Sequence, residues 1–261
     1  MIGHLTAVWR FRHFLLALVR LDLRLRYRRS VLGVGWSLLN PIAMTIVFTV
    51  VFSSLLGSGT WDYAPMLLTG MAIWNFMKEA ATAGSRALIA NEAYIRQSPL
   101  PYTLYPLRTV CGQAIHTGIA LAVVVGLLMI VKQSVVPLTM VPVIVPGLVL
   151  TFLAAWAVAT IAAFVNVYFQ DTQHLLEVAA QIGFFLTPIM YKREVLDNQR
   201  LGWLVDLNPV VPFMEMIRTP LLAGHAPPGG LYLAACGITV VLGLLAAGTT
   251  AWLQKRVVFH L

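Results

Sequence analysis

Residues 19–57 read VRLDLRLRYRRSVLGVGWSLLNPIAMTIVFTVVFSSLLG and place a strongly basic segment directly before a long apolar one. The arginines of the basic segment are Arg20, Arg24, Arg26, Arg28 and Arg29. The apolar segment is long enough to cross a hydrocarbon core of about 30 Å, which takes about 20 helical residues. Arginines beside a span hold that end on the cytoplasmic side and attract anionic lipid. The stretch predicts an integral membrane protein with a cytoplasmic N-terminal segment.

The composition of the chain supports the same class. Of its 261 residues, 59% are hydrophobic and 11% are charged, less than half of the roughly 25% charged residues in soluble domains. The net charge of +8 lies mainly beside apolar segments, so membrane topology explains it and no nucleic-acid partner is expected. Cys111 and Cys236 lie in apolar segments without metal-ligand spacing, and we expect no metal site.

Six apolar segments have the length of a transmembrane helix. They are Gly35–Leu56, Tyr63–Ala83, Leu104–Val131, Leu138–Val165, Thr172–Met190 and Leu231–Leu253. We therefore expect an all-α, polytopic membrane protein that forms a single transmembrane domain over residues 1–261, with 1–33 as a cytoplasmic amphipathic helix and 34–261 as the six-span region. Six spans put both termini on one side. Basic residues are more numerous in the N-terminal segment, the connection between spans two and three and the C-terminal tail than in the opposite connections, which predicts that the termini lie in the cytoplasm.

Two segments outside the spans are expected to touch the membrane. Residues 5–29 mix apolar and basic side chains, which predicts an amphipathic helix lying in the membrane plane. The alternation of these residues also fits a strand, but an isolated strand there would leave its backbone unpaired. Residues 207–224 are too apolar for a free loop and predict short re-entrant helices between spans five and six, started by Pro209 and Pro212 and holding a Glu215–Arg218 ion pair.

Two further patterns leave alternatives open. Residues 83–106 form either an ordinary interfacial loop or a docking helix for a cytoplasmic partner, with Glu92 and Arg96 spaced for an ion pair. On the fifth span, a polar face is expected because the spacing puts four side chains on one side of the helix. These side chains are Asp171, His174, Glu177 and Gln181. They could cap the helix and reach the interface, line a translocation path, or supply a catalytic dyad.

The nucleotide and hydrolase motifs that would indicate an enzyme do not occur in the sequence. There is no G-x-x-x-x-G-K-[ST] phosphate loop, no H-E-x-x-H and no G-x-S-x-G. The chain therefore cannot hold ATP by the phosphate-loop route.

An ordered set of motifs along nearly the whole chain resembles a known family. The basic segment leads into YRRSVLG and WSLLNP, followed by GMAIWNFMKEA, NEAYIRQSPLP, YFQDTQHLLEVAAQIGFFLTPIMY and LNPVVPFMEMIRTPLL. The set resembles the permease subunits of ABC-type polysaccharide and polyol-phosphate exporters, the type-2 permease class, which includes exporters of O-antigen, teichoic acid and capsule.

The resemblance implies an exporter of the inner (cytoplasmic) membrane with several partners. Two copies of the chain would pair with two copies of a separate ATP-binding subunit, which would carry the ATP and Mg, so this chain would bind no cofactor and would not be an enzyme. The substrate would be a glycan on a polyprenyl-diphosphate lipid. Residues 207–219 would form gate helices on the outer side.

Three sets of residues are assigned roles as hypotheses. The diphosphate head group would meet Arg24, Arg26, Arg28 and Arg29. The translocation path would be lined by Phe48, Phe52, Glu177, Gln181, Phe184 and Phe185. The ATPase would dock on Arg86, Asn91, Glu92, Tyr94 and Arg96. Two alternatives remain: a type-2 permease that exports a drug or small lipid, and a polytopic membrane enzyme that acts on a polyprenyl lipid.

Overall fold

The computed structural model describes residues 9–26, 28, 33, 35–55, 60–97, 100–133, 135–191, 193, 200–254 and 257. Within these residues every regular element is helical, which confirms the all-α prediction. The elements are α2 (Arg12–Arg26), α3 (Gly35–Leu55), α4 (Thr60–Ser85), η1 (Ile89–Asn91), α5 (Glu92–Gln97), α6 (Leu104–Lys132), α7 (Val136–Thr139), α8 (Val141–Tyr168), α9 (Thr172–Leu186), α11 (Gly202–Leu207), α12 (Val211–Ala223) and α13 (Gly229–Leu253).

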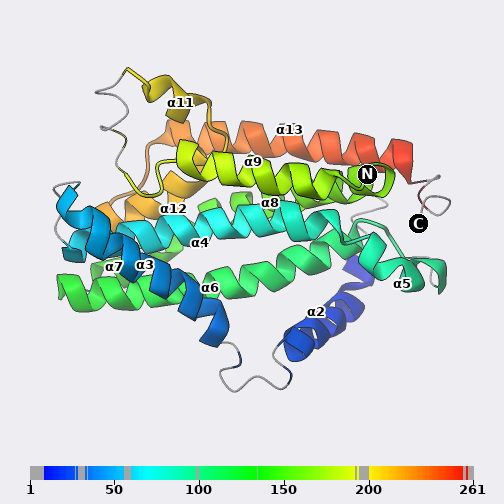
Figure 1. Ribbon diagram of the computed structural model, residues 1–261, viewed down its shortest axis with the longest axis horizontal. Helices are drawn as coiled ribbons and strands as arrows, with labels where there is room; N and C mark the ends of the chain where they lie inside the picture. The colour runs from blue at the N-terminus through cyan, green and yellow to red at the C-terminus, as the bar shows by residue number, and fades with distance from the viewer. Residues whose placement is uncertain are drawn as a thin grey trace.

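The long helices form an elongated bundle. Helices α4, α6, α8, α9 and α13 run beside one another and reverse direction in chain order, while α3 crosses them obliquely (Figure 1). Helices α2 and α5 lie at the end of the bundle where α13 finishes, and α7 and α12 lie at the opposite end (Figure 1). Helix α2 and the last turn of α13 thus lie at the same end of the bundle; that both termini are cytoplasmic stays a prediction.

Only part of the predicted set of spans meets the length and hydropathy expected of a transmembrane helix. Among the described residues, three helices are long and apolar enough to cross a membrane: α6, α8 and α13. Helix α4 carries Lys78 and Glu79 near its end, and α9 has 15 residues. The predicted fifth span, Thr172–Met190, is helical only to Leu186. The six-span count therefore stays a prediction.

Helices α4 and α8 form the centre of the bundle. Helix α4 contacts α3, α6, α8, α9 and α12, and α8 also contacts α13. In α4 the side chains of Leu67, Ile73 and Ala80 are fully buried. Helix α13, by contrast, exposes Leu233 and Val240, and such apolar side chains are suited to a lipid environment. The bundle thus has a packed centre and an apolar outer surface.

A buried arginine attaches α12 to the segment that follows α9. Helix α12 starts at Val211 with a proline in its first turn, as the sequence predicted. The Nη1 atom of Arg218 lies 3.2 Å from Oε1 of Glu215, which confirms the predicted pair, and it donates a 2.7 Å hydrogen bond to the carbonyl oxygen of Pro188. A buried charge needs such partners, so these contacts fix where α12 packs.

The close approach of α4 and α8 depends on Gly84. A methyl group at this position would lie 2.7 Å from Cβ of Ala159. We expect Gly84→Ala to destabilise the protein by about 1–3 kcal/mol, because the added carbon forces the two helices apart. Thermal unfolding of the purified protein in detergent measures this.

Gly126 on α6 supplies the matched control, because a methyl group there would meet no atom within 4 Å. Gly126→Ala should leave stability unchanged or raise it by up to about 1 kcal/mol through its better helix propensity. Equal unfolding temperatures for the two variants would contradict the assigned packing.

Candidate functional site

A cavity of about 570 Å³ lies between α3, α4 and α9. This volume falls within the range of small-molecule pockets. From α3 and α4 its lining residues are Met44, Phe48, Met71, Trp74, Asn75, Lys78, Glu79 and Thr82. Arg86 adds to the lining just after α4, and α9 contributes Glu177, Ala180, Gln181, Phe184 and Phe185. Aromatic, amide and charged groups thus share one site.

Helical spacing explains why these residues meet. On α4 the lining positions 71, 75, 78 and 82 recur every three or four residues, and so do positions 177, 181 and 184 on α9. Such positions lie on one face of a helix. Helices α4 and α9 are in contact, so each helix turns one face of its surface towards the same space.

Aromatic rings form one wall of the cavity. The centroids of Trp74 and Phe184 are 6.2 Å apart with an interplanar angle of 68°, and those of Phe184 and Phe185 are 5.4 Å apart at 87°. Both are edge-to-face contacts, which are favourable because the positive edge of one ring meets the negative face of the other. The wall is therefore an ordered aromatic surface.

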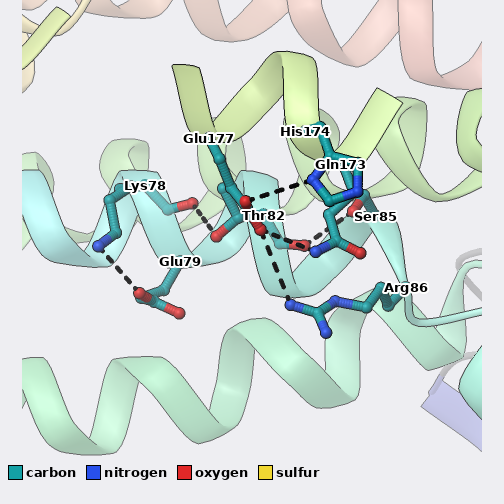
Figure 2. Close-up of polar contacts among 8 residues, drawn as sticks. All are labelled: Lys78, Glu79, Thr82, Ser85, Arg86, Gln173, His174 and Glu177. Atoms are coloured by element: carbon teal, nitrogen blue, oxygen red, sulfur yellow. Dashed lines mark hydrogen bonds and ion pairs between the residues drawn. The ribbon is translucent and has the colours of Figure 1, made fainter. Parts of the chain in front are cut away.

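Charged side chains form a second wall, and each cation lies beside a carboxylate. Figure 2 shows Nζ of Lys78 directed at Glu79, 3.2 Å from Oε1, and Nη2 of Arg86 directed at Glu177, 4.0 Å from Oε1. Glu177 also accepts a 2.7 Å hydrogen bond from Nε2 of Gln173. Two positive and two negative groups balance, so these four lining charges sum to zero.

The structure gathers most residues of the predicted translocation path into this cavity. Phe48, Glu177, Gln181, Phe184 and Phe185 all line it. The side chain of Phe52 lies outside the described residues. Asp171 and His174, which share the polar face of α9 in the sequence, are not in the lining, although Nδ1 of His174 lies 3.7 Å from Glu177.

The residues predicted to dock an ATPase divide into two groups. On α5, Arg96 and Glu92 form the predicted pair at 2.7 Å, and Tyr94 is exposed. Arg86 and Asn91 face other parts of the chain. Arg86 belongs to the cavity, and Asn91 is held by hydrogen bonds to Arg108 and to the carbonyl oxygen of Ala87.

The arginines predicted to meet a phosphate head group are exposed where the structure describes them. Arg24 and Arg26 lie in the last turns of α2, and Arg28 follows that helix. Arg29 lies outside the described residues. The same helix buries Leu15, Leu18 and Val19 against α6, so its basic side chains remain accessible from outside the bundle.

A family model described as ABC-2 type transporter matches residues 13–222 of this sequence. The chain belongs to the ABC-2 type transporter family. The sequence is 25% identical over 212 residues to the O-antigen export system permease protein RfbA of Klebsiella pneumoniae, covering 80% of each chain. It is 25% identical over 244 residues to a protein of the same name from Myxococcus xanthus, covering 93% of each.

The polysialic acid transport protein KpsM of Escherichia coli is also similar, at 22% identity over 218 residues, covering 82% of this chain and 83% of that protein. ABC-2 family membership makes the chain a membrane permease subunit and not an enzyme, and it implies a separate ATPase partner. The absence of a phosphate-loop motif is consistent with this division.

Sequence reasoning missed several polar and aromatic residues of this ABC-2 permease. Trp74, Lys78 and Glu79 line the cavity but were not among the residues assigned to the translocation path. Arg108, the fifth residue of a predicted span, was also left without a role. Ionisable residues within spans usually face protein or water, and that rule would have marked all three charged positions for closer attention.

The polar lining predicts that water reaches the cavity. In a background with Cys111 and Cys236 replaced by alanine, we expect Gln181→Cys to react quickly with a charged, water-soluble thiol reagent, because the reactive thiolate forms in water. Val240→Cys, on the exposed apolar face of α13, is the control and should react slowly in the membrane. Equal labelling rates, followed by mass spectrometry, would contradict a water-filled cavity.

Proposed function

We propose that this ABC-2 family chain is the permease subunit of an ATP-driven exporter that moves a lipid-linked polysaccharide across the cytoplasmic membrane. The observation that carries the proposal is the cavity between α3, α4 and α9, which joins an aromatic wall to a charge-balanced polar wall. Three relatives are named for O-antigen export or polysialic acid transport. ATP and Mg belong to the partner ATPase, and this chain binds no cofactor.

The two walls match the two kinds of surface on a sugar. The C–H faces of a sugar ring are apolar and suit the rings of Trp74 and Phe184, while its hydroxyl groups suit the amides of Asn75 and Gln181. Ligand sites commonly combine apolar surface with a few polar groups that fix orientation. Because the charges of the lining cancel, the cavity carries no net charge that would retain an ion.

The exposed polar side of α9 is consistent with a second copy of the chain in the exporter. Gln181 and Glu177 line the cavity from α9, which also exposes Val178 and Ile182. Ionisable and strongly polar groups at membrane depth face protein or water and not lipid. We therefore infer that a second copy covers the open side of the cavity, so that the glycan passes between two chains.

Arginines on α2 are suited to the head group of the lipid carrier. The planar guanidinium fork can bond a phosphate through two parallel hydrogen bonds. Arg24 and Arg26 are exposed in the last turn of α2, and Arg28 is exposed just after it. If α2 lies at the cytoplasmic interface, with both termini in the cytoplasm, these side chains would meet a polyprenyl diphosphate before its glycan enters the cavity.

The ATPase would act at the same end of the bundle. The exposed residues Tyr94 and Arg96 of α5, with the half-buried Glu92, offer it a contact surface at the same end of the bundle as α2 (Figure 1). Closure of the ATP-bound partner would push on this surface and on α2, and would open the path between the two copies. At the opposite end, α12 would be part of the outer gate.

Depletion of the chain in its native cell tests the proposed function. We expect glycan linked to a polyprenyl lipid to accumulate on the cytoplasmic side and surface glycan to fall, as measured by lipid extraction and surface staining. Unchanged glycan together with altered tolerance to drugs would contradict the proposal and favour a drug or small-lipid exporter. Turnover of a polyprenyl lipid by the purified chain alone would instead favour an enzyme.

Neutralising the α2 arginines tests the head-group role. In the triple variant Arg24→Gln, Arg26→Gln, Arg28→Gln we expect surface glycan to fall sharply, since each arginine near an anionic surface contributes about 1 kcal/mol. Membrane insertion, followed by fractionation, should remain normal.

The double variant Arg10→Gln, Arg12→Gln removes charge from the same N-terminal region without touching the three head-group arginines. It should export at close to the normal rate. Normal export by the triple variant would show that the head group is recognised elsewhere.

A further inference from the structure

Arg108, near the start of α6, connects three segments that are far apart in the sequence. Its Nε atom donates a 2.6 Å hydrogen bond to Oδ2 of Asp22 on α2, and its Nη2 atom also bonds Oδ1 of Asp22. Its Nη1 atom donates a 2.7 Å hydrogen bond to Oδ1 of Asn91 in η1. The guanidinium group thus holds α2 on one side and η1 on the other.

The surroundings of this group favour a fixed geometry. The Arg108 side chain is 12% exposed, whereas that of Asp22 is 42% exposed. Asp22 continues the face of α2 on which Leu15, Leu18 and Val19 pack against α6. A bidentate arginine–carboxylate pair whose guanidinium group is largely buried is more directional than a pair of two exposed side chains. The position of α2 on α6 is therefore fixed by both packing and hydrogen bonds.

Asn91 extends the connection into the segment before α5. Its Nδ2 atom donates a 2.8 Å hydrogen bond to the carbonyl oxygen of Ala87, so its side chain is held at both ends. Ala87 and Leu88 are buried. A displacement of η1 is therefore transmitted to Arg108 through a side chain with little freedom to rotate.

We propose that Arg108 is a positioning residue that makes α2, η1 and α5 move as one unit with the adjoining end of α6. This inference rests on the proposed function, in which the ATPase acts on α5 and the lipid head group meets α2. Through Arg108, motion received at α5 reaches the arginines of α2. Phosphate capture and ATP-driven motion are then linked by one side chain that contacts neither ligand.

Substitution of Arg108 in the complete complex with the ATPase tests this role. We expect Arg108→Gln to keep ATP hydrolysis within about twofold of the wild type while surface glycan falls about fivefold, the low end of coupling between protein sites. Arg108→Lys keeps the charge but loses the planar guanidinium group, and its surface glycan should lie between that of the wild type and that of Arg108→Gln. Arg193→Gln removes an arginine from the 2.8 Å pair with Asp206 and should change neither quantity.

A distance measurement separates coordinated motion from simple stability. With Cys111 and Cys236 replaced by alanine, spin labels at Leu25→Cys on α2 and Ala93→Cys on α5 occupy exposed positions. We expect a narrow distance distribution with Arg108 present and a broad one in Arg108→Gln. If Arg108→Gln fails to assemble, Asp22→Asn removes the charge of the more exposed partner and should broaden the distribution in the same way.

Three outcomes decide the inference. Broadened distances with ATP hydrolysis retained and export lost support it. An unchanged distribution in both variants overturns it, and so does a loss of export that only parallels the loss of assembled complex. Failure of the proposed function would appear separately, as normal glycan after depletion of the wild-type chain. The distance measurement would then still show whether Arg108 holds α2 and α5 together.

Discussion

Charged side chains within an apolar helical bundle must find partners, because an unpaired charge away from water costs several kcal/mol. In this protein that requirement determines how neighbouring elements are held. Arg218 ties α12 to the turn after α9, and Arg108 ties α2 and η1 to α6. Each guanidinium group has directional donors, so satisfying it fixes the relative placement of the segments that supply its acceptors.

Helix α4 connects the packing of the bundle to the candidate site. One side of this helix packs against α8 so closely that Gly84 leaves no room for a methyl group. Another side carries Trp74 and Lys78 into the cavity shared with α3 and α9. Because a single rigid helix carries both sides, the packing of the bundle sets the position of the lining. Lys78 and Arg86 each lie beside a carboxylate, so the site can be polar without leaving either cation unpaired.

Contacts between residues close in the sequence could be predicted, and distant contacts could not. Helical spacing predicted the Glu92–Arg96 and Glu215–Arg218 pairs, and it placed Glu177 and Gln181 on one face. The Arg108–Asp22 contact joins residues 86 positions apart, and nothing in either local pattern selects the other. Asn91 was assigned to an ATPase contact because spacing cannot show that its amide is already occupied. The end of α9 at Leu186 lies two residues before Pro188; because the residue before a proline disfavours the helical region, that proline, and not the length of the apolar run, marks the end.

A polymer exporter has to bind two parts of its substrate in different ways, and the proposed function divides these tasks between α2 and the cavity. The diphosphate head group is a small, concentrated charge that must be captured once, which suits several exposed arginines on α2. The glycan must pass many times over the same lining, so each repeat has to bind well enough to enter and weakly enough to leave, as in conduction through a pore. A lining whose charges cancel and whose rings offer broad apolar contact meets that condition for uncharged sugar units. A lining with a large net charge would retain either the diphosphate or its counter-ions inside the path, so it is the balance of charge within the lining, with the basic side chains of α2 outside it, that allows repeated passage.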